Sequence, residues 1–169
     1  MKVLRFLKEG IRDPLLDYDF VTTPVIIGKH ETYAQAFLRQ EPPFLMIEHD
    51  IIINDESFPV ISRYTRIINH DTELLVFPYY LYPSSTNLKH PVIAHRQFNG
   101  HQIEWIRHQP YFQIVDSFGL GCLYVPSKYI FSLINPLWDY PDFDSNLSEA
   151  VHPYVVTYCA PNPIVTHVH

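Results

Sequence analysis

The pattern strand, helix, strand over residues 20–53 constrains the fold of this chain more than any other feature. Residues 20–27, FVTTPVII, are rich in β-branched side chains and are followed by a glycine, which predicts a strand. Residues 31–40 place apolar side chains at helical spacing and are followed by two prolines, which predicts a short helix. Residues 44–53 are apolar at most positions, as the middle strands of a covered sheet are. This order predicts a parallel strand–helix–strand unit.

Beyond residue 53, the sequence predicts further strands and helices within a single domain that spans residues 1–169. Expected helices cover residues 58–68 and a segment that opens at Pro126, where a proline suits the first turn. The expected strands cover residues 74–82, 111–115, 122–125, 151–158 and 164–169, and the expected loops cover residues 83–101 and 135–146. We therefore expect one α/β domain.

The composition limits the partners of the chain. Lys and Arg number 12 against 18 Asp and Glu, so the formal net charge is -6, whereas proteins that bind a nucleic-acid backbone usually carry basic patches. The apolar residues 3–7 are interrupted by Arg5 and are too short for the core of a signal peptide. No apolar run approaches the roughly 18 residues that span a bilayer. We expect a cytoplasmic protein that binds neither nucleic acid nor membrane.

Two carboxylates interrupt the strand predicted at residues 44–53. Alternate side chains of a strand share a face, so Glu48 and Asp50 point the same way and His49 points the other way. Two carboxylates at this spacing do not both stay ionised in a dry site unless a cation lies between them or one takes a proton. Mg²⁺ and Mn²⁺ are bound by a few carboxylates, with substrate phosphates completing the sphere. The alternative is a pair of solvated acids at the end of a strand.

Imidazoles gather in the last part of the sequence. His167 and His169 are two residues apart in a segment predicted to be extended, so they share a face, and His152 lies upstream of them. Imidazole is the commonest transition-metal ligand, although a frayed tail explains the last residues equally well. No Cys-x-x-Cys accompanies these histidines, so a structural zinc site is not expected.

Other signatures are weak or missing from the sequence. Gly119 and Gly121 flank Leu120, which permits close approach of a ligand to the main chain or simply a tight turn. The patterns GxGxxG, GxxxxGK[ST] and GxSxG do not occur, and neither Cys122 nor Cys159 has an electropositive sequence context. Dinucleotide, P-loop and covalent nucleophilic chemistry are therefore not expected.

A succession of short motifs resembles the compact phage and bacterial glycosyltransferase-like proteins of the GT-A type. The motifs are TYAQAFLRQ (32–40), EHDI (48–51), VFPYYLY (76–82), GLGCLYVPSKYI (119–130) and THVH (166–169). In GT-A enzymes an acid-x-acid motif at the end of a central strand holds a divalent cation against the diphosphate of a nucleotide-sugar. The resemblance implies a compact, Rossmann-like three-layer sandwich with a mostly parallel central sheet.

The resemblance also implies roles for residues of the matching motifs. Glu48 and Asp50 fall on the acid-x-acid motif and would bind Mn²⁺ or Mg²⁺ and the diphosphate, with Asp50 at the reacting centre. The closing histidine that often completes the metal sphere would be His167 or His169. The turn from Gly119 to Gly121 would lie where the donor or acceptor approaches.

The function expected from these motifs is metal-dependent transfer of a sugar from a nucleotide-sugar donor to an acceptor. Lys29 and Arg39 are candidate contacts to the diphosphate or the base, and a solvated face is the alternative explanation for both. Inverting transfer needs a general base at the acceptor hydroxyl, and Asp116, Asp139 and Asp142 are the candidates. The sequence specifies neither the acceptor, nor the stereochemistry, nor the oligomeric state.

Two alternatives use the same residues. In the first, a metal-dependent hydrolase gathers one or two transition metals to activate water, with ligands from His49, Asp50, His152, His167 and His169. In the second, the chain is a non-catalytic nucleotide-sugar-binding or virion-associated protein of the same fold.

Overall fold

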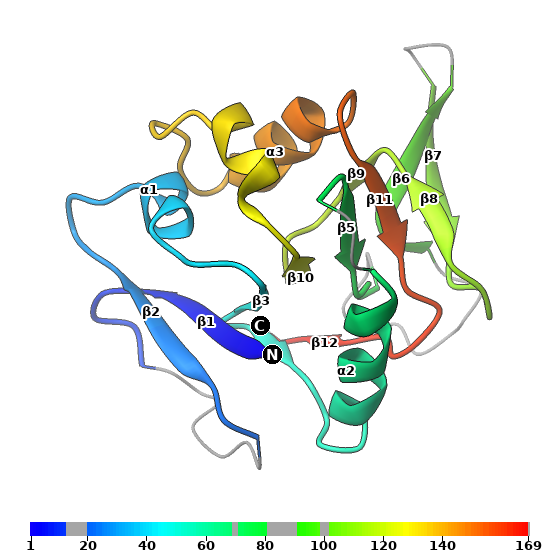
Figure 1. The fold of residues 1–169 in the computed structure, drawn as a ribbon, viewed down its shortest axis with the longest axis horizontal. Coiled ribbons are helices and arrows are strands. Elements are labelled where there is room, and N and C mark those ends of the chain that lie inside the picture. The colour runs from blue at the N-terminus through cyan, green and yellow to red at the C-terminus, as the bar shows by residue number, and fades with distance from the viewer. Residues whose placement is uncertain (13–19, 69–70, 81–90, 99–101, 169) are drawn as a thin grey trace.

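A mixed seven-stranded sheet forms the centre of the protein, in a computed structural model that describes residues 1–12, 20–68, 71–80, 91–98 and 102–168. The strand order is β2-β1-β3-β10-β5-β11-β8. These strands are β1 (Lys2–Lys8), β2 (Thr23–Ile27), β3 (Phe44–Glu48), β5 (Glu73–Val76), β8 (Gln113–Val115), β10 (Cys122–Val125) and β11 (Val156–Cys159). Figure 1 shows β1 and β2 at one side of the molecule and β8 at the other.

The directions of the strands correct the expected fold class. Strands β2 and β3 both run parallel to β1, and β11 runs parallel to β5. Strand β10, however, is antiparallel to both of its neighbours, and β8 is antiparallel to β11. The expected mostly parallel, Rossmann-like GT-A sandwich is therefore wrong. Apolar runs do not encode direction: all four residues of β10 are buried, as in a parallel core strand.

Two smaller antiparallel sheets flank the central one. Strand β12 (Thr166–His167) pairs with β4 (Ile51–Ile52) directly after the Glu48–Asp50 motif. The other sheet has the order β7-β6-β9, formed by β6 (Pro91–Phe98), β7 (Gln102–Arg107) and β9 (Ser117–Phe118). The central sheet thus supplies the core, and the two small sheets attach the C-terminus and a hairpin to it.

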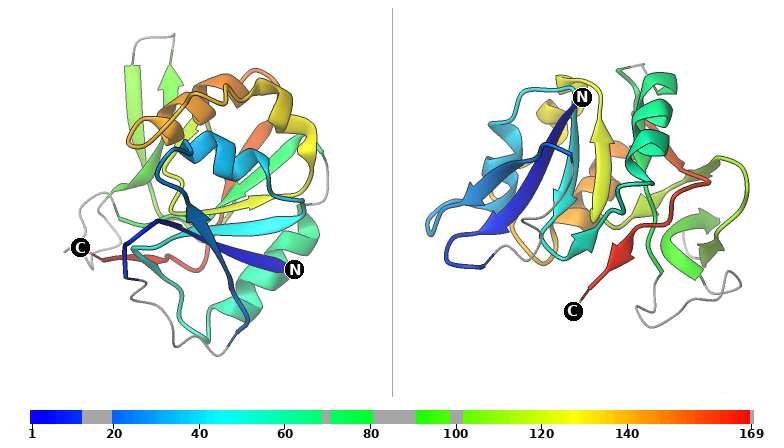
Figure 2. Two further views of the ribbon diagram at one scale, coloured as in Figure 1. Left: turned by 90° about the vertical axis from the view of Figure 1, so that its left-hand side faces the viewer. Right: turned by 90° about the horizontal axis from the view of Figure 1, so that it is seen from below.

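Helices cover both faces of the central sheet. The helices α1 (Tyr33–Leu38) and α3 (Phe143–Val151), with the 3-10 helix η1 (Lys128–Leu133), lie on one face, and α2 (Phe58–Ile67) lies on the other (Figures 1 and 2). Alternate residues of β3 enter two separate apolar clusters: Phe44 and Met46 on the α1 side, Leu45 and Ile47 on the α2 side. The period-2 alternation of a strand thereby supplies both cores from one segment.

The strand–helix–strand unit predicted from residues 20–53 is confirmed, because β2 and β3 lie parallel on either side of β1 with α1 between them in sequence. A capping box at the start of α1 fixes its first turn, with Thr32 and Gln35 exchanging side-chain-to-backbone hydrogen bonds. The predicted strand 44–53 is wrong in one respect: it breaks into a turn at His49 and Asp50 and resumes as β4.

Several other boundaries differ from the sequence-based expectation. The segment 91–98, predicted as loop, is strand β6, and α3 begins inside the loop predicted at 135–146. The helix predicted at 58–68 is confirmed as α2, and the helix predicted to open at Pro126 is η1. Residues 81–90, in the predicted strand 74–82 and loop 83–101, lie outside the described residues. Polar, turn-rich composition concealed β6 because this hairpin is only partly covered by the core.

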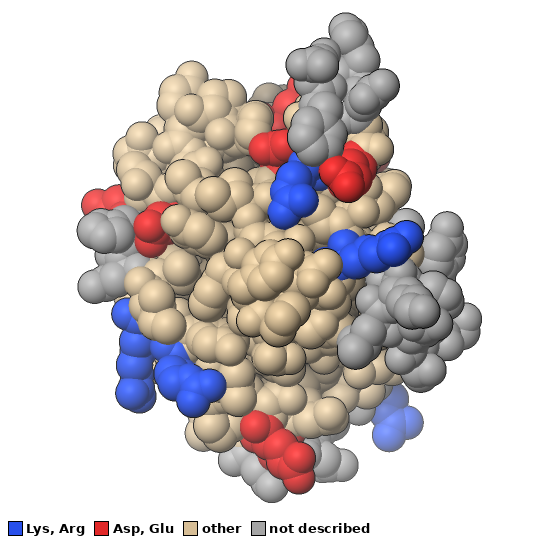
Figure 3. Space-filling view, turned by 90° about the vertical axis from the view of Figure 1, so that its right-hand side faces the viewer, with Lys and Arg blue, Asp and Glu red and all other residues tan. Residues whose placement is uncertain are grey.

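The right-hand side of Figure 1 is the side of the molecule on which β6, β7, β8 and α2 lie. Viewed from there, Lys, Arg, Asp and Glu are scattered and the centre of the face is uncharged (Figure 3). None of the described helices is long and apolar enough to cross a membrane.

Replacing Phe37 with Ala should destabilise the protein by about 3–5 kcal/mol, since the change leaves a cavity among packed rings. Phe37 is 0% exposed and contacts the rings of Phe6, Phe44, Phe131 and Phe143. The measurement is the free energy of unfolding in urea. The matched control is V21A, at an 89% exposed position, which should change it by less than about 0.5 kcal/mol. Equal effects of the two variants would contradict this account of the core.

Candidate functional site

A groove follows the carboxyl ends of the parallel strands β2, β1 and β3. Because these strands are parallel, their ends meet at one edge of the sheet, where open α/β sheets bind ligands. Three adjoining pockets of about 300, 280 and 220 Å³ form this strand-end groove. The first two share Lys8 and Ile27, and the last two share Tyr33, Glu48, Asp50 and Tyr140.

The two ends of the strand-end groove differ in chemistry. The lysine end is lined by Lys8, at the end of β1, and Lys29, after β2, together with the carboxylates of Glu9, Glu31 and Asp139. The acidic end is lined by Glu48, Asp50 and Asp144. The groove therefore joins a site with two lysines and three carboxylates to a site with three carboxylates and, in its described lining, no Lys or Arg.

Glu48 is the most perturbed carboxylate of the acidic end. Burial raises its pKa from 4.5 to about 7, and the neighbouring charge of Asp50 adds to the rise. The hydroxyl of Tyr33 donates a hydrogen bond to Glu48 Oε1 at 3.0 Å, which opposes the rise. Burial and the charge of Glu48 also raise the pKa of Tyr33, so its hydroxyl stays protonated and remains a donor. Glu48 is thus placed to exchange a proton near neutral pH.

Asp50 is held by the C-terminal strand. Pairing of β12 with β4 brings His167 beside it, with His167 Nε2 2.9 Å from Asp50 Oδ2. The backbone N–H of Val168 donates to the carbonyl of Asp50 at 2.8 Å, which fixes the turn. The other carboxylate oxygen, Oδ1, is buried and has no hydrogen-bond partner among the described residues. Asp50 therefore has one oriented oxygen and one oxygen available to a ligand.

Tyr79 packs against His167, the partner of Asp50. Its ring stacks on the imidazole of His167 with centroids 5.2 Å apart and planes at 15°. The glycines explain how the ring fits: a Cβ on Gly119 would lie 2.5 Å from Tyr79 Oη, and one on Gly121 would lie 2.6 Å from Tyr79 Cε1. Gly119 and Gly121 thus make room for a tyrosine, which the sequence did not reveal.

Asp144, Tyr33 and Tyr79 are site residues that the sequence analysis missed. Asp144 lies in the first turn of α3, and burial raises its pKa. Asp144 was assigned to the expected loop 135–146 and was not considered as a site residue, because nothing in the sequence showed that a helix would bring it to β3. Tyr33 lies in the motif TYAQAFLRQ, to which the sequence analysis gave no site role, and its hydroxyl bonds Glu48.

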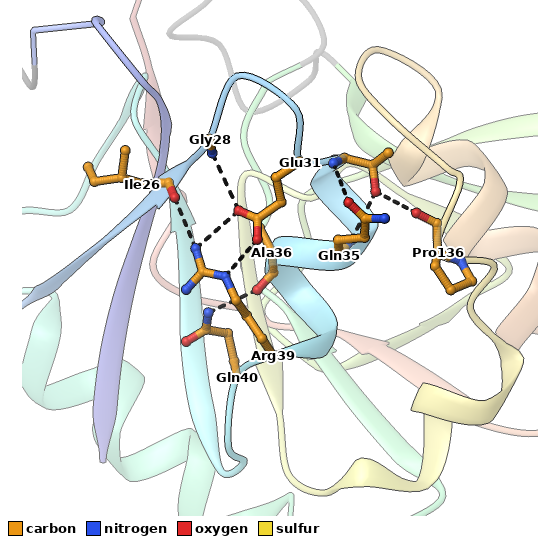
Figure 4. Close-up of polar contacts among 9 residues, drawn as sticks. Ile26, Gly28, Glu31, Gln35, Ala36, Arg39, Gln40 and Pro136 are labelled. Carbon is orange, nitrogen blue, oxygen red and sulfur yellow. Dashed lines mark hydrogen bonds and ion pairs between the residues drawn. The ribbon is translucent and has the colours of Figure 1, made fainter.

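The predicted phosphate contacts are separated by the structure. Lys29 lines the lysine end, but Arg39 lies among structural contacts (Figure 4). Its guanidinium bonds both carboxylate oxygens of Glu31, at 2.9 and 3.2 Å, and the carbonyl of Ile26 at 2.9 Å. Arg39 therefore ties α1 to β2.

The predicted general bases also lie apart. Asp139 lines the lysine end, where its Oδ1 accepts hydrogen bonds from the backbone N–H groups of Tyr33 and Tyr140. Asp142 is the residue before α3 and makes no side-chain capping bond. Asp116 lines a different pocket and pairs there with His152. The histidines proposed for a hydrolase are thus divided between two places, with His49 and His167 at the groove.

The expected metal centre is corrected by the geometry. Within the part of the chain that the structure describes, no group of three or more His, Cys, Asp and Glu side chains is placed to hold a metal ion. His167 engages Asp50 directly, and His169 lies outside the described residues. The residues therefore do not form the self-contained site for Mn²⁺ or Mg²⁺ that the motif suggested.

Comparisons with known proteins identify a similar fold but do not indicate a function. No protein-family model matches the chain, and no curated protein matches it. Among solved structures, the chain is similar to "Crystal Structure of A197 from STIV", with a TM-score of 0.56 and 15% sequence identity. The match covers 100% of this chain and 95% of that one. At this identity the likeness shows a shared fold alone.

The raised pKa of Glu48 predicts a pH-dependent stability that E48Q should lack. A carboxyl whose pKa is raised on folding stabilises the protein fully below its unfolded pKa, and this contribution is lost as pH rises towards 7. Between about pH 4.5 and 7.5 the wild type should lose about 2–3 kcal/mol relative to E48Q. Urea unfolding across this range measures the difference. The control E56Q, at an exposed carboxylate outside the groove, should follow the wild type.

Gly121→Ala should destabilise the protein by about 1–3 kcal/mol, because the new Cβ meets both Tyr79 and, at 2.7 Å, Ile51 Cδ1. Gly28→Ala is the matched control, since its Cβ would meet nothing closer than Glu31 Cβ at 3.8 Å. Thermal and urea unfolding of both variants provide the comparison. A G121A protein as stable as G28A would show that the Tyr79 packing is not as described.

Proposed function

We propose that the strand-end groove binds a nucleotide-sugar and transfers its sugar to an acceptor hydroxyl. The observation that carries the proposal is the unlike lining of the two ends of the groove. Lys8 and Lys29 line one end beside three carboxylates, whereas the described lining of the other end has three carboxylates and no Lys or Arg. A nucleotide-sugar has the matching polarity: an anionic diphosphate joins the nucleoside to a neutral, hydroxyl-rich sugar.

The lysine end suits the diphosphate. Its carboxylates are largely engaged: Glu31 is paired with Arg39, Asp139 accepts two backbone hydrogen bonds, and Glu9 accepts one from the N–H of Lys29. The ammonium groups of Lys8 and Lys29 are then the charges available to an anion. Lys8 also lies 4.9 Å from the centre of the Tyr140 ring, so it stands where the two pockets join.

The acidic end suits the sugar. Carboxylate oxygens accept hydrogen bonds from sugar hydroxyls, and Asp50 Oδ1 is a buried acceptor with no partner among the described residues. His167 holds the other oxygen of Asp50 in place, and Tyr79 holds His167. The pocket of about 220 Å³ is large enough for one sugar ring and small enough to orient it.

The proton transfer is assigned to Glu48. An acceptor oxygen attacks the anomeric carbon, the bond from that carbon to the diphosphate oxygen breaks, and the acceptor proton passes to Glu48. A base is most effective when its pKa lies near the working pH, and the pKa of Glu48 is about 7. The negative charge that stays on the diphosphate is stabilised by Lys8 and Lys29.

The requirement for a divalent cation stays a prediction, and the transfer step proposed above does not include a cation. Lys8, Lys29, Glu48 and Asp50 perform the binding and proton transfer described above without it. Assays with and without Mn²⁺ therefore decide the cation requirement separately from the roles of these residues.

The test is release of nucleotide from a panel of UDP-, GDP- and CMP-sugars. With the donor that is turned over, kcat/KM should rise about tenfold per pH unit below 7 and level off above it. E48Q should lower kcat by about 10²–10⁴-fold while donor still raises the melting temperature. A double variant K8A/K29A should lose the donor-dependent rise in melting temperature.

The exposed-carboxylate variant E56Q is the control and should behave as the wild type in both assays. Donor binding without nucleotide release in the wild type would favour a non-catalytic nucleotide-sugar-binding protein. The absence of both donor binding and nucleotide release, with every donor of the panel, would refute the proposal.

A further inference from the structure

A second pocket, of about 310 Å³, lies between the β6–β7 hairpin and α3. We call it the side pocket, and it is lined by His95, Gln97, Ile103, Asp116, Ser117, Ser145, Glu149 and His152. It shares no lining residue with the strand-end groove. The proposed transfer reaction leaves it without a role.

The walls of the side pocket are held in place by the fold. The hairpin pairs His95 with Trp105 and Gln97 with Ile103, so one face of β6 and β7 forms a floor. Helix α3 forms the facing wall and is attached to β9 by Ser148, which is 1% exposed. The Ser148 hydroxyl accepts a hydrogen bond from the N–H of Phe118 at 3.3 Å, and its single hydrogen is shared between the carbonyls of Asp144, at 2.9 Å, and Phe118, at 3.2 Å. The pocket is therefore formed before any ligand arrives.

The polar groups of the side pocket converge on Asp116. Its Oδ1 lies 3.3 Å from His152 Nδ1, and its Oδ2 accepts a hydrogen bond from the backbone N–H of Gln97 at 2.7 Å. His95 Nδ1 is buried and has no hydrogen-bond partner among the described residues. Burial lowers the pKa of His95, so the ring is neutral at neutral pH and offers one donor and one acceptor.

The charge of the side pocket disfavours phosphates and other anions. None of its lining residues is Lys or Arg, and two are carboxylates. Arg96, on the neighbouring position of β6, is bound elsewhere: it donates to the carbonyl of Ile114 at 3.1 Å and to Gln113 Oε1 at 3.2 Å. An anionic ligand would meet like charge without a compensating cation.

The geometry of the side pocket also gives no support for a cation site, because no group of three or more His, Cys, Asp and Glu side chains among the described residues is placed to hold a metal ion. Asp116 is held by His152 and the Gln97 N–H, and Glu149, exposed on α3, is the second carboxylate of the lining. The other lining groups are neutral amides, hydroxyls and imidazoles, which both donate and accept. Ile103, 57% exposed, adds apolar surface to the lining, and the ring of Trp105 packs on His95 with centres 5.0 Å apart.

We propose that the side pocket binds a neutral, hydroxyl-rich ligand, that is, a sugar, at a place distinct from the strand-end groove. Each hydroxyl of such a ligand needs both a donor and an acceptor, and the lining of the pocket supplies both. The proposal does not depend on glycosyl transfer, because a free sugar can occupy the pocket without a donor.

The experiment is a titration of the ¹⁵N-labelled full chain with free glucose, galactose, mannose and N-acetylglucosamine, followed by amide chemical shifts. At least one sugar should cause saturable shifts at Gln97, Ser117 and Glu149. Asp116→Asn and Glu149→Gln should each weaken its affinity about fivefold, the effect of one lost hydrogen bond. Glu149 is exposed, so its variant tests the site even if Asp116→Asn fails to fold.

The control E56Q should bind the same sugar with wild-type affinity. Putrescine and inorganic phosphate serve as competing probes: saturation by either of them, with no sugar response, would overturn the proposal. So would sugar-dependent shifts confined to Glu48, Asp50 and His167, since they would place the sugar in the strand-end groove. Unchanged affinity in both side-pocket variants would have the same consequence.

Discussion

The parallel pairing of β1 with both β2 and β3 is the interaction on which the rest of the site depends. It places Lys8, Gly28 and Glu48, the residues at or just after the ends of three strands, along one edge of the sheet. Residues twenty or more positions apart in sequence thereby line one groove. The aromatic cluster around Phe37 holds α1 against these strands, and with it Tyr33 against Glu48.

The acidic end is assembled from four separate segments. Strand β3 brings Glu48, the turn after it brings Asp50, α3 brings Asp144, and the C-terminal strand brings His167. Burial of acids without enough positive charge has a free-energy cost, which appears as the raised pKa of Glu48. Proteins retain such costs mostly where the groups do chemistry, and this is the reason for locating function here.

Helix α3 belongs to both candidate sites. Its first turn supplies Asp144 to the groove, while Ser145 and Glu149 face the side pocket. Its attachment through the buried Ser148 to β9 makes it a fixed wall between two differently charged spaces. The two pockets therefore stay separate within one small protein, with no shared lining residue.

The sequence by itself determined local structure where the signals are local. The β-branched run before Gly28, the helical spacing of residues 31–40 and the prolines after them were enough to predict β2, α1 and β3. Glu48 and Asp50 were singled out as acids within a predicted strand 44–53, whereas the structure ends β3 at Glu48. The sequence did not determine the direction of β10, because an apolar run has the same pattern in either orientation. The partners of the acids were also decided only by tertiary structure. Tyr33, Asp144 and His167 reach Glu48 and Asp50 through strand pairing and helix packing, and such long-range contacts depend on the whole core and not on neighbouring residues.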